Sequence, residues 1–221
     1  MGKNSFGING EVLAYVAEEL KQLRQVGVEL GLVVGAGNIF RGVAGASKGM
    51  DRAVGDNMGM LATVINCLAM QDAMERMGIP TRVMSAVPMT SICEPYVRRR
   101  ALRHLEKGRI VIFAAGTGNP YFTTDTAAVL RALEIEAEVI IKCTRVDGVY
   151  DKDPLRHPEA IKFDRLSYSE VLRLDLKVMD TAAISLAKDN AKLIIVLDMN
   201  VPGNILKTIK GEQVGTLACP E

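Results

Sequence analysis

One stretch decides the fold, and it reads Gly116-Thr117-Gly118-Asn119-Pro120-Tyr121-Phe122-Thr123-Thr124-Asp125-Thr126-Ala127-Ala128. An apolar run over residues 109–115 leads into it and an alanine-rich amphipathic segment follows, which predicts a strand, a glycine turn and a helix start. Open α/β sheets place ligands at such junctions. Glycines let the backbone approach a ligand closely, and the free N–H groups of a helix start favour an anion. We interpret this stretch as a phosphate site.

A purely structural interpretation of the same stretch is also open. Any strand-to-helix junction uses turn glycines and a Thr or Asp cap. Here two glycines, an Asn-Pro pair, two aromatic residues, four threonines and an aspartate lie close together. A simple turn needs far fewer such residues, so the density favours the ligand interpretation.

Composition indicates a globular chain that binds small ligands. Its 221 residues allow one large α/β domain or two small ones, with 48% hydrophobic and 24% charged residues. The 27 Lys and Arg residues against 26 Asp and Glu residues leave a net charge of +1. Such a balance gives no general attraction to nucleic acid or to an acidic membrane surface. We therefore expect no specific nucleic acid and no membrane partner.

The cysteines and the hydropathy pattern indicate a reducing compartment. Cys67, Cys93, Cys143 and Cys219 are far apart in the sequence and form no C-x-x-C pair. Structural zinc and a disulfide framework are therefore not expected. No N-terminal signal pattern occurs, and no apolar run approaches the length needed to cross a bilayer. The pattern predicts a cytoplasmic protein.

Two more polar loops follow predicted strands. A strand over residues 28–34 ends at Gly35-Ala36-Gly37-Asn38-Ile39-Phe40-Arg41-Gly42, and one over residues 139–143 leads into the segment 142–154. The second of these could be a solvent loop, but its place after a buried strand favours a ligand role. Phe40 and Tyr121 occupy the third glycine position of G-x-G-x-x-G, and no P-loop occurs. Neither common phosphate-binding fingerprint is present.

Strand and helix patterns alternate along the whole chain. Helices are predicted after the Asn9 cap, over 52–77, from Glu94-Pro95 onward, and over 126–133, 167–174, 178–190 and after 204. Further strands are predicted over 81–85, 193–198 and 215–218. This alternation predicts an α/β three-layer sandwich with a mostly parallel central sheet covered by helices on both faces. The three polar loops should converge on one edge.

Two of these helices carry further expectations. The 52–77 helix would bury an apolar stripe, and its Met- and Ala-rich surface suggests a homo-oligomer. The stripe consists of Leu61, Val64, Ile65, Leu68 and Met74. The helix after Glu94-Pro95 carries Arg98, Arg99, Arg100 and Arg103. Because the chain is otherwise neutral, a solvated or subunit-contact face is favoured there over nucleic-acid binding.

Several motifs together resemble the amino-acid kinase superfamily and, within it, the family of bacterial UMP kinases. The match extends over essentially the whole sequence. It includes Gly-Asn-Ile-Phe-Arg-Gly at 37–42, Met-Asp-Arg at 50–52, Gly-Asp-Asn-Met-Gly-Met-Leu-Ala-Thr at 55–63, Gly-Thr-Gly-Asn-Pro-Tyr-Phe-Thr-Thr-Asp at 116–125, Lys-Val-Met-Asp at 177–180 and Asn-Val-Pro-Gly at 200–203.

The resemblance implies transfer of the γ-phosphoryl group of Mg-ATP to UMP, giving UDP for pyrimidine nucleotide biosynthesis. The implied enzyme is a single domain over residues 1–221 that assembles as a homohexamer. Mg²⁺ would arrive with ATP, and no metal site made of protein residues is implied. Activation by GTP and inhibition by UTP are implied more weakly.

The resemblance also implies roles for individual residues. Arg41 would pair with the UMP phosphate and take part in catalysis, Asp56 would accept from the ribose hydroxyls, and Asp125 matches an acidic catalytic position. UMP would be enclosed by Thr117, Gly118, Asn119, Pro120, Tyr121, Phe122, Thr123 and Thr124, with Ala36 beside them. Thr117 and Asn119 would lie near the uracil and Thr124 near the transferring phosphate. ATP would be bound by Gly37, Arg41, Thr144, Tyr150 and Asp153.

One departure concerns the start of the chain. Relatives begin with a Lys-containing strand and a Lys-Leu-Ser-Gly loop that cradles the ATP phosphates, whereas residues 1–8 here align just after that loop. We therefore expect low turnover from these 221 residues. Lys3 lies beyond the motif and does not replace the loop lysine.

Two other functions stay open at this point. A sibling kinase acting on aspartate, glutamate or carbamate would share the fold but lack the motifs at 55–63 and 116–125. A non-catalytic nucleotide sensor or oxyanion-storage relative would bind a nucleotide without turnover. Comparing UMP turnover with UMP binding separates these alternatives.

Overall fold

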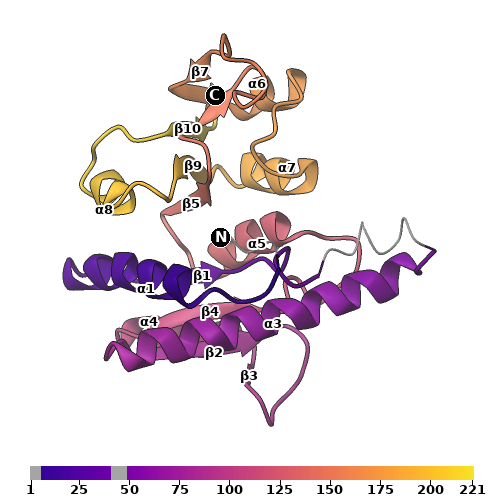
Figure 1. Ribbon diagram of the computed structural model, residues 1–221, viewed down its shortest axis with the longest axis vertical. Helices are drawn as coiled ribbons and strands as arrows, with labels where there is room; N and C mark the ends of the chain where they lie inside the picture. Colours follow the sequence, from indigo (N-terminus) through magenta and orange to yellow (C-terminus); the bar gives the residue numbers. More distant parts are fainter. Residues whose placement is uncertain (1–5, 41–48) are drawn as a thin grey trace. The chain divides into compact units, whose positions relative to one another are not determined.

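The computed structural model describes residues 6–40 and 49–221. Arg41 therefore lies outside the described residues. Contacts divide the chain into two compact units, Met1–Arg131 and Ala132–Glu221. Each unit contains its own four-stranded sheet, and Figure 1 labels most of its strands. A single domain over the whole chain stays a prediction.

The sheet of the first unit is entirely parallel. Its strands are β1 (Gly31–Val33), β2 (Thr81–Ser85), β3 (Glu94–Pro95) and β4 (Ile110–Ala114), in the order β1-β4-β2-β3. All five residues of β4 are buried, as expected of a central parallel strand covered on both faces. The loops that follow β1 and β4 leave from adjacent strands at the same edge, because the two strands pair in parallel.

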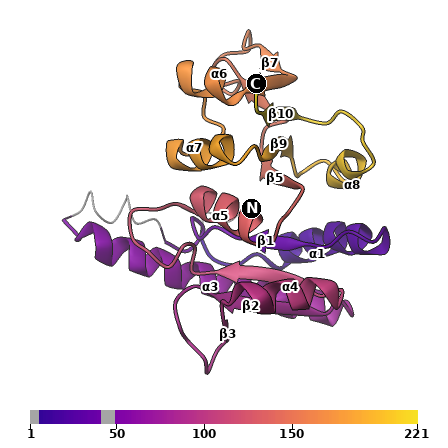
Figure 2. The same cartoon turned by 180° about the vertical axis from the view of Figure 1, so that it is seen from behind.

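Four helices pack around this sheet: α1 (Gly10–Gln25), α3 (Arg52–Arg76), α4 (Arg98–Glu106) and α5 (Thr124–Glu134). The Asn9 side chain caps α1 as predicted, by accepting from two backbone N–H groups. Helix α3 crosses in front of the strands in Figure 1, whereas α4 lies in front of them in the reverse view of Figure 2. The two helices thus cover opposite faces of the sheet.

Helix α3 corrects two sequence-based predictions. Val64 and Met74 are buried, but Leu61 and Ile65 are 54% and 49% exposed. The inward face instead carries Thr63 and Asn66, both buried. By length and composition α3 could also cross a membrane, contrary to our expectation for the sequence. In the fold it packs against α1, β2 and β4, which is the position of a core helix.

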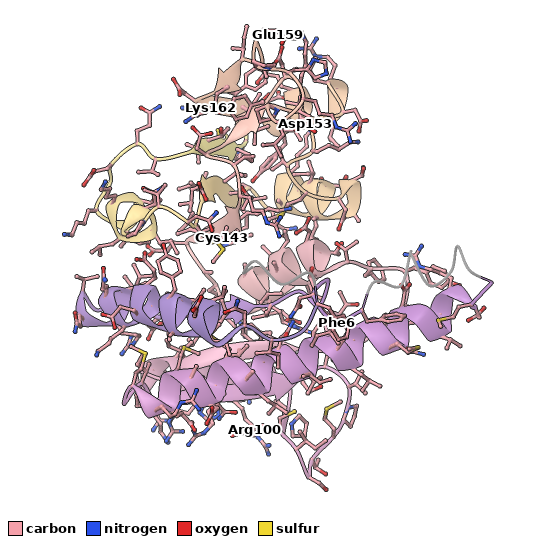
Figure 3. The ribbon with its side chains drawn as sticks, viewed as in Figure 1. Phe6, Arg100, Cys143, Asp153, Glu159 and Lys162 are labelled. Atoms are coloured by element: carbon pink, nitrogen blue, oxygen red, sulfur yellow. The ribbon has the colours of Figure 1, made fainter. Side chains whose placement is uncertain are left out.

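The segment before α4 also differs from the prediction. Glu94 and Pro95 do not open a helix; they form the short strand β3, which pairs with Met84 and Ser85 of β2. Proline is tolerated there because β3 is an edge strand. Helix α4 starts three residues later, at Arg98. Its arginine side chains are solvent-exposed, and that of Arg100 points away from the strands (Figure 3).

The second unit has a mixed sheet. Strands β5 (Val139–Thr144), β8 (Arg165–Ser167), β9 (Leu193–Asp198) and β10 (Thr216–Cys219) lie in the order β5-β9-β10-β8. Only the β9–β10 pair of this sheet is antiparallel. The remaining elements are the ribbon of β6 (Val149–Tyr150) and β7 (Lys162–Phe163) and the helices α6 (Tyr168–Arg173), α7 (Thr181–Asp189) and α8 (Asn204–Ile209). The predicted class, α/β with mostly parallel strands, is confirmed.

Candidate functional site

The loop after β4, which we call the glycine loop (residues 116–124), begins and turns in strained backbone. Ala115 has φ 60° and Tyr121 has φ 72°, both in the left-handed region that residues other than glycine seldom occupy. Gly116 and Gly118 share this region without steric cost. Strained residues persist only where their surroundings hold them, and they gather at functional sites. The glycine loop is therefore held by specific contacts.

Two side chains of α3 supply those contacts. The Thr63 hydroxyl accepts from the backbone N–H of Ala115 at 2.8 Å and donates to the carbonyl of Met60. About two turns before it on the helix, Asp56 Oδ2 accepts from the backbone N–H of Tyr121 at 2.8 Å. Both non-glycine residues in left-handed backbone are thus anchored to the same helix. Their positions are set by partners more than fifty residues away in the sequence.

The loop after β1 is anchored to α3 as well. Asn66 donates to the carbonyl of Gly35 at 2.8 Å and exchanges two amide hydrogen bonds with Asn38. A Cβ atom placed on Gly35 would lie 3.6 Å from the hydroxyl of Thr124. The loops after β1 and β4 therefore converge, as predicted for these two. The third polar loop belongs to the second unit and is described by itself below.

The start of α5 carries the polar end of the glycine loop. The Thr123 hydroxyl accepts from the N–H of Asp125 at 3.1 Å, and the Thr123 carbonyl accepts from Ala127. Asp125 lies in the first turn of this helix of 11 residues. The N-terminal end of a helix is the positive end of the helix dipole, which favours negative charge nearby. The glycine loop thus ends at a helix terminus suited to an anion.

Arg131 supports the glycine loop from the other end of α5, and sequence reasoning missed it. It is only 5% exposed, and its guanidinium stacks 3.9 Å from the centre of the Tyr96 ring. It donates to the carbonyl of Gly116 at 3.4 Å. Tyr96 in turn packs edge-on against Phe113 of β4. A basic residue spaced seven positions from Thr124 on the buried helix face was the available signal.

The tip of the glycine loop is stabilised by hydrogen bonds within the loop itself and is exposed to solvent. Thr117 and Asn119 bond to each other through a side chain and the backbone. The side chains of Tyr121 and Phe122 are 67% and 52% exposed. A Cβ on Gly118 would approach the carbonyl of Ala86 to 3.3 Å, and its φ of 82° already excludes most residues. The tip thus presents polar and aromatic groups without burying them.

In the second unit, the predicted ATP-binding residues lie along the segment 144–157. The Thr144 hydroxyl bonds to both backbone groups of Val146, and Asp153 accepts from the N–H of Leu155. Tyr150 donates to Asp147 at 2.6 Å, and Lys162 donates to the other oxygen at 3.2 Å. Figure 3 shows Asp153 and Lys162 in this unit.

The bond between Tyr150 and Asp147 changes the acidity of both groups. It is the main reason that the pKa of Asp147 lies below its ordinary value of 3.8, and the Lys162 ammonium acts in the same direction. The same bond raises the pKa of Tyr150. Both side chains are therefore held in the forms they have at neutral pH: a carboxylate and a neutral phenol.

Position 148 requires glycine because the side chain of Thr216 lies too close for any Cβ atom. A Cβ there would lie 2.5 Å from the hydroxyl of Thr216, which accepts from the N–H of Val149 and donates to the carbonyl of Phe163. Any side chain would displace β10 from the β6–β7 ribbon. Asp-Gly is a common turn pair, and Gly148 therefore also has a packing reason at this position.

The described residues contain no group of three or more His, Cys, Asp or Glu side chains placed to hold a metal ion. Asp125 offers a single carboxylate at the start of α5. Proteins usually take Mg²⁺ through one or two carboxylates and the phosphates of a nucleotide. The donor set therefore fits a metal that arrives with a nucleotide.

Comparisons with known proteins agree with this architecture. The model of the amino acid kinase family matches residues 1–198. A UMP kinase from Bacillus anthracis superposes with a TM-score of 0.95 at 37% identity, over 99% of this chain and 91% of that one. A UMP kinase from Ureaplasma parvum gives 0.92 at 32% identity, over 99% and 93%. A uridylate kinase from Archaeoglobus fulgidus gives 0.75 at 28% identity, over 95% and 93%. The chain belongs to the amino acid kinase family.

Proposed function

We propose that this chain is a UMP kinase, which transfers the γ-phosphoryl group of ATP to UMP and forms UDP. The observation that carries the proposal is the anchored glycine loop, residues 116–124, in a chain similar over 99% of its length to UMP kinases. Phosphoryl transfer needs mainly alignment of two substrates and stabilisation of charge on the transferred group. Backbone N–H groups, arginine and a helix start can supply both without a covalent nucleophile.

The acceptor is assigned to the first unit. UMP would lie along the glycine loop, with Thr117 and Asn119 near the base and Thr124 near the phosphate at the start of α5. Asp56 would accept from the ribose. The backbone of Ala36 and Gly37 would lie beside the phosphates, in the loop that converges with Thr124.

The donor is assigned to Thr144, Tyr150 and Asp153 of the second unit, together with Gly37 and Arg41. All three side chains in the second unit take part in local hydrogen bonds. Mg²⁺ would accompany ATP and neutralise part of its phosphate charge. Asp125, at the start of α5, is the protein carboxylate that we assign to this charge balance.

An acceptor screen tests the activity. ADP release is measured with UMP, CMP, AMP, aspartate and glutamate as acceptors, and UMP binding is measured in parallel by calorimetry. We expect UMP to be preferred. Preference for an amino acid would indicate a sibling kinase, and UMP binding without turnover would indicate a nucleotide sensor.

Arg41 provides a second test, although it lies outside the described residues. A guanidinium offers a two-pronged donor that matches phosphate oxygens, whereas lysine is a compact point charge. Arg41→Lys should raise KM for UMP roughly 10-fold and lower kcat less, because mostly uniform binding is lost. A change confined to KM for ATP would contradict the assignment.

We also propose that the protein is a homo-oligomer, and a homohexamer by the resemblance. Helix α3 exposes Val54, Met58, Leu61 and Ile65, spaced as one stripe and each at least 40% exposed. A second copy of the chain is the partner that we assign to it. Leu61→Glu should reduce the mass measured by sedimentation equilibrium, whereas Leu155→Glu, on an exposed loop of the second unit, should not. A wild-type monomer at micromolar concentration would contradict the proposal.

The remaining assignments concern regulation and cellular setting. GTP would activate the enzyme and UTP would inhibit it, as tested by adding each to the ADP-release assay. UDP would serve pyrimidine nucleotide biosynthesis in the cytoplasm. All four cysteines are free, which is consistent with a reducing compartment. Burial raises the pKa of Cys67 to about 12, so this thiol stays protonated.

A further inference from the structure

Arg52, the first residue of α3, contacts both a predicted ribose-binding residue and the glycine loop. Its Nε donates to Asp56 Oδ2 at 2.8 Å. Its guanidinium carbon lies 5.8 Å from the centre of the Tyr121 ring, within the usual range of a cation–π contact. Because Asp56 Oδ2 also accepts from the N–H of Tyr121, the three residues form a closed cluster.

The place of Arg52 on the helix is unfavourable by local rules. A cation in the first turn opposes the helix dipole, and the acidic group at that end is the cap Asp51, which accepts from Val54. An arginine that precedes an aspartate by four positions is also the weaker orientation for such a pair. A residue that breaks local rules is expected where a tertiary contact compensates. Its tertiary contact here is with the ring of Tyr121.

Tyr121 needs that contact because its backbone is strained. Its φ of 72° lies in the left-handed region, and its side chain is 67% exposed, so core packing does not hold it. The Asp56 carboxylate holds its N–H and the Arg52 guanidinium faces its ring. Arg52 therefore acts on the glycine loop by two routes.

The two oxygens of the Asp56 carboxylate differ in their hydrogen-bond partners. Oδ2 accepts both bonds, from Arg52 and from Tyr121, and within residues 6–40 and 49–221 nothing donates to Oδ1. The side chain is 14% exposed. Arg52 thus fixes which oxygen is used internally and leaves the other for a ligand hydroxyl.

We propose that Arg52 is a positioning residue for the nucleoside monophosphate: it orients the Asp56 carboxylate and holds Tyr121 in the conformation that shapes the glycine loop. Its contact with the substrate is indirect. The proposal rests on the proposed function for its kinetic consequences, but not for its effect on the loop.

The test compares Arg52→Met with Arg76→Met in the whole protein. Arg76 pairs with Asp72 on the same helix, also four residues apart, and lies at the opposite end of α3 from Arg52, so it is a matched control. Hydrogen exchange of the Tyr121 amide is measured by NMR without substrate. In Arg52→Met we expect it to accelerate about 10-fold, because a charge-assisted bond is weakened. Arg76→Met should leave it unchanged.

Kinetics provide the second readout. Arg52→Met should raise KM for UMP about 10-fold and leave KM for ATP unchanged, since only the acceptor side is disturbed. Arg52→Lys, which keeps the charge near Asp56, should recover part of this loss, whereas a purely structural role would show equal losses for both substrates.

The outcomes separate this inference from the function on which it builds. Unchanged Tyr121 exchange in Arg52→Met overturns the positioning role, whatever the kinetics. Faster exchange with an unchanged KM for UMP also overturns it. If the wild-type protein does not phosphorylate UMP, the proposed function fails, and Tyr121 exchange alone still decides whether Arg52 holds the loop.

Discussion

The glycine loop of the first unit is fixed by distant side chains, whereas the three side chains assigned to ATP in the second unit bond within local turns, although the backbone N–H of Val149 beside them donates to the distant Thr216. Ala115 and Tyr121 bond to side chains of α3 at 52 and 65 residues' distance in the sequence. Thr144, Tyr150 and Asp153 bond to groups two or three residues away. Backbone groups held by distant partners keep one position before the ligand arrives, whereas side chains held only within local turns can adjust to it. We expect the first region to respond to single substitutions far more than the second.

The largest difference in the free energy of unfolding should appear between substitutions of two threonines, one in each region. Thr63→Val removes the hydroxyl that accepts from the buried N–H of Ala115, and should cost about 2 kcal/mol of unfolding free energy. Thr144→Val removes an equivalent bond within a local, partly exposed turn and should cost roughly 0.5 kcal/mol. Urea denaturation of both variants measures this. Equal costs would remove the distinction between the two regions.

A smaller effect, on the choice between ribose and deoxyribose substrates, is expected for Asp56→Asn. The amide oxygen can still accept from Tyr121, but an amide NH₂ would replace the carboxylate oxygen that we assign to the ribose. The preference for UMP over 2′-deoxy-UMP should fall about 10-fold, the value of one hydrogen bond to a charged group. Asp72→Asn, on the exposed side of α3, is the control and should keep the preference. An intact preference in Asp56→Asn would require another ribose contact.

Two glycine substitutions should move stability in opposite directions. Gly118→Ala places a Cβ at φ 82° and 3.3 Å from a carbonyl oxygen, which should cost about 1 kcal/mol. Gly59→Ala lies in open space within α3 and should stabilise the protein by roughly 0.5 kcal/mol through helix propensity. Thermal unfolding of the two variants decides. A stabilising Gly118→Ala would mean that the loop readily changes shape.

The smallest effect should come from Tyr150→Phe. Without the phenol donor, the pKa of Asp147 should rise toward 3.8, although Lys162 still lowers it. A carboxyl group with a lowered folded-state pKa stabilises the fold above its unfolded pKa and loses that contribution as pH falls through the folded value. The variant should therefore lose less stability on acidification from about pH 4, by a few tenths of a kcal/mol because Asp147 is largely exposed. Carboxyl NMR titration measures the pKa directly.

Much of the fold could be predicted from local patterns. Strand β4, the Asn9 cap of α1 and the start of α5 follow from apolar runs, a capping residue and turn glycines. Strand β3 could not, because a two-residue edge strand has no pattern of its own and exists only by pairing with β2. The predicted buried face of α3 was wrong for a related reason. Thr63 and Asn66 are buried because they bond to the loops after β4 and β1, and those loops are distant in the sequence.

For the candidate site, the sequence by itself determined which loops carry the polar residues and which family the motifs resemble, because residue types and spacings are local information. Only the tertiary structure decided what holds those loops. The bonds from Ala115 and from the left-handed Tyr121 to α3 join segments 52 and 65 residues apart, and the buried Arg131 donates to Gly116 across 15 residues. Such contacts arise when packing brings strained backbone against a polar helix face, and no local pattern encodes that encounter.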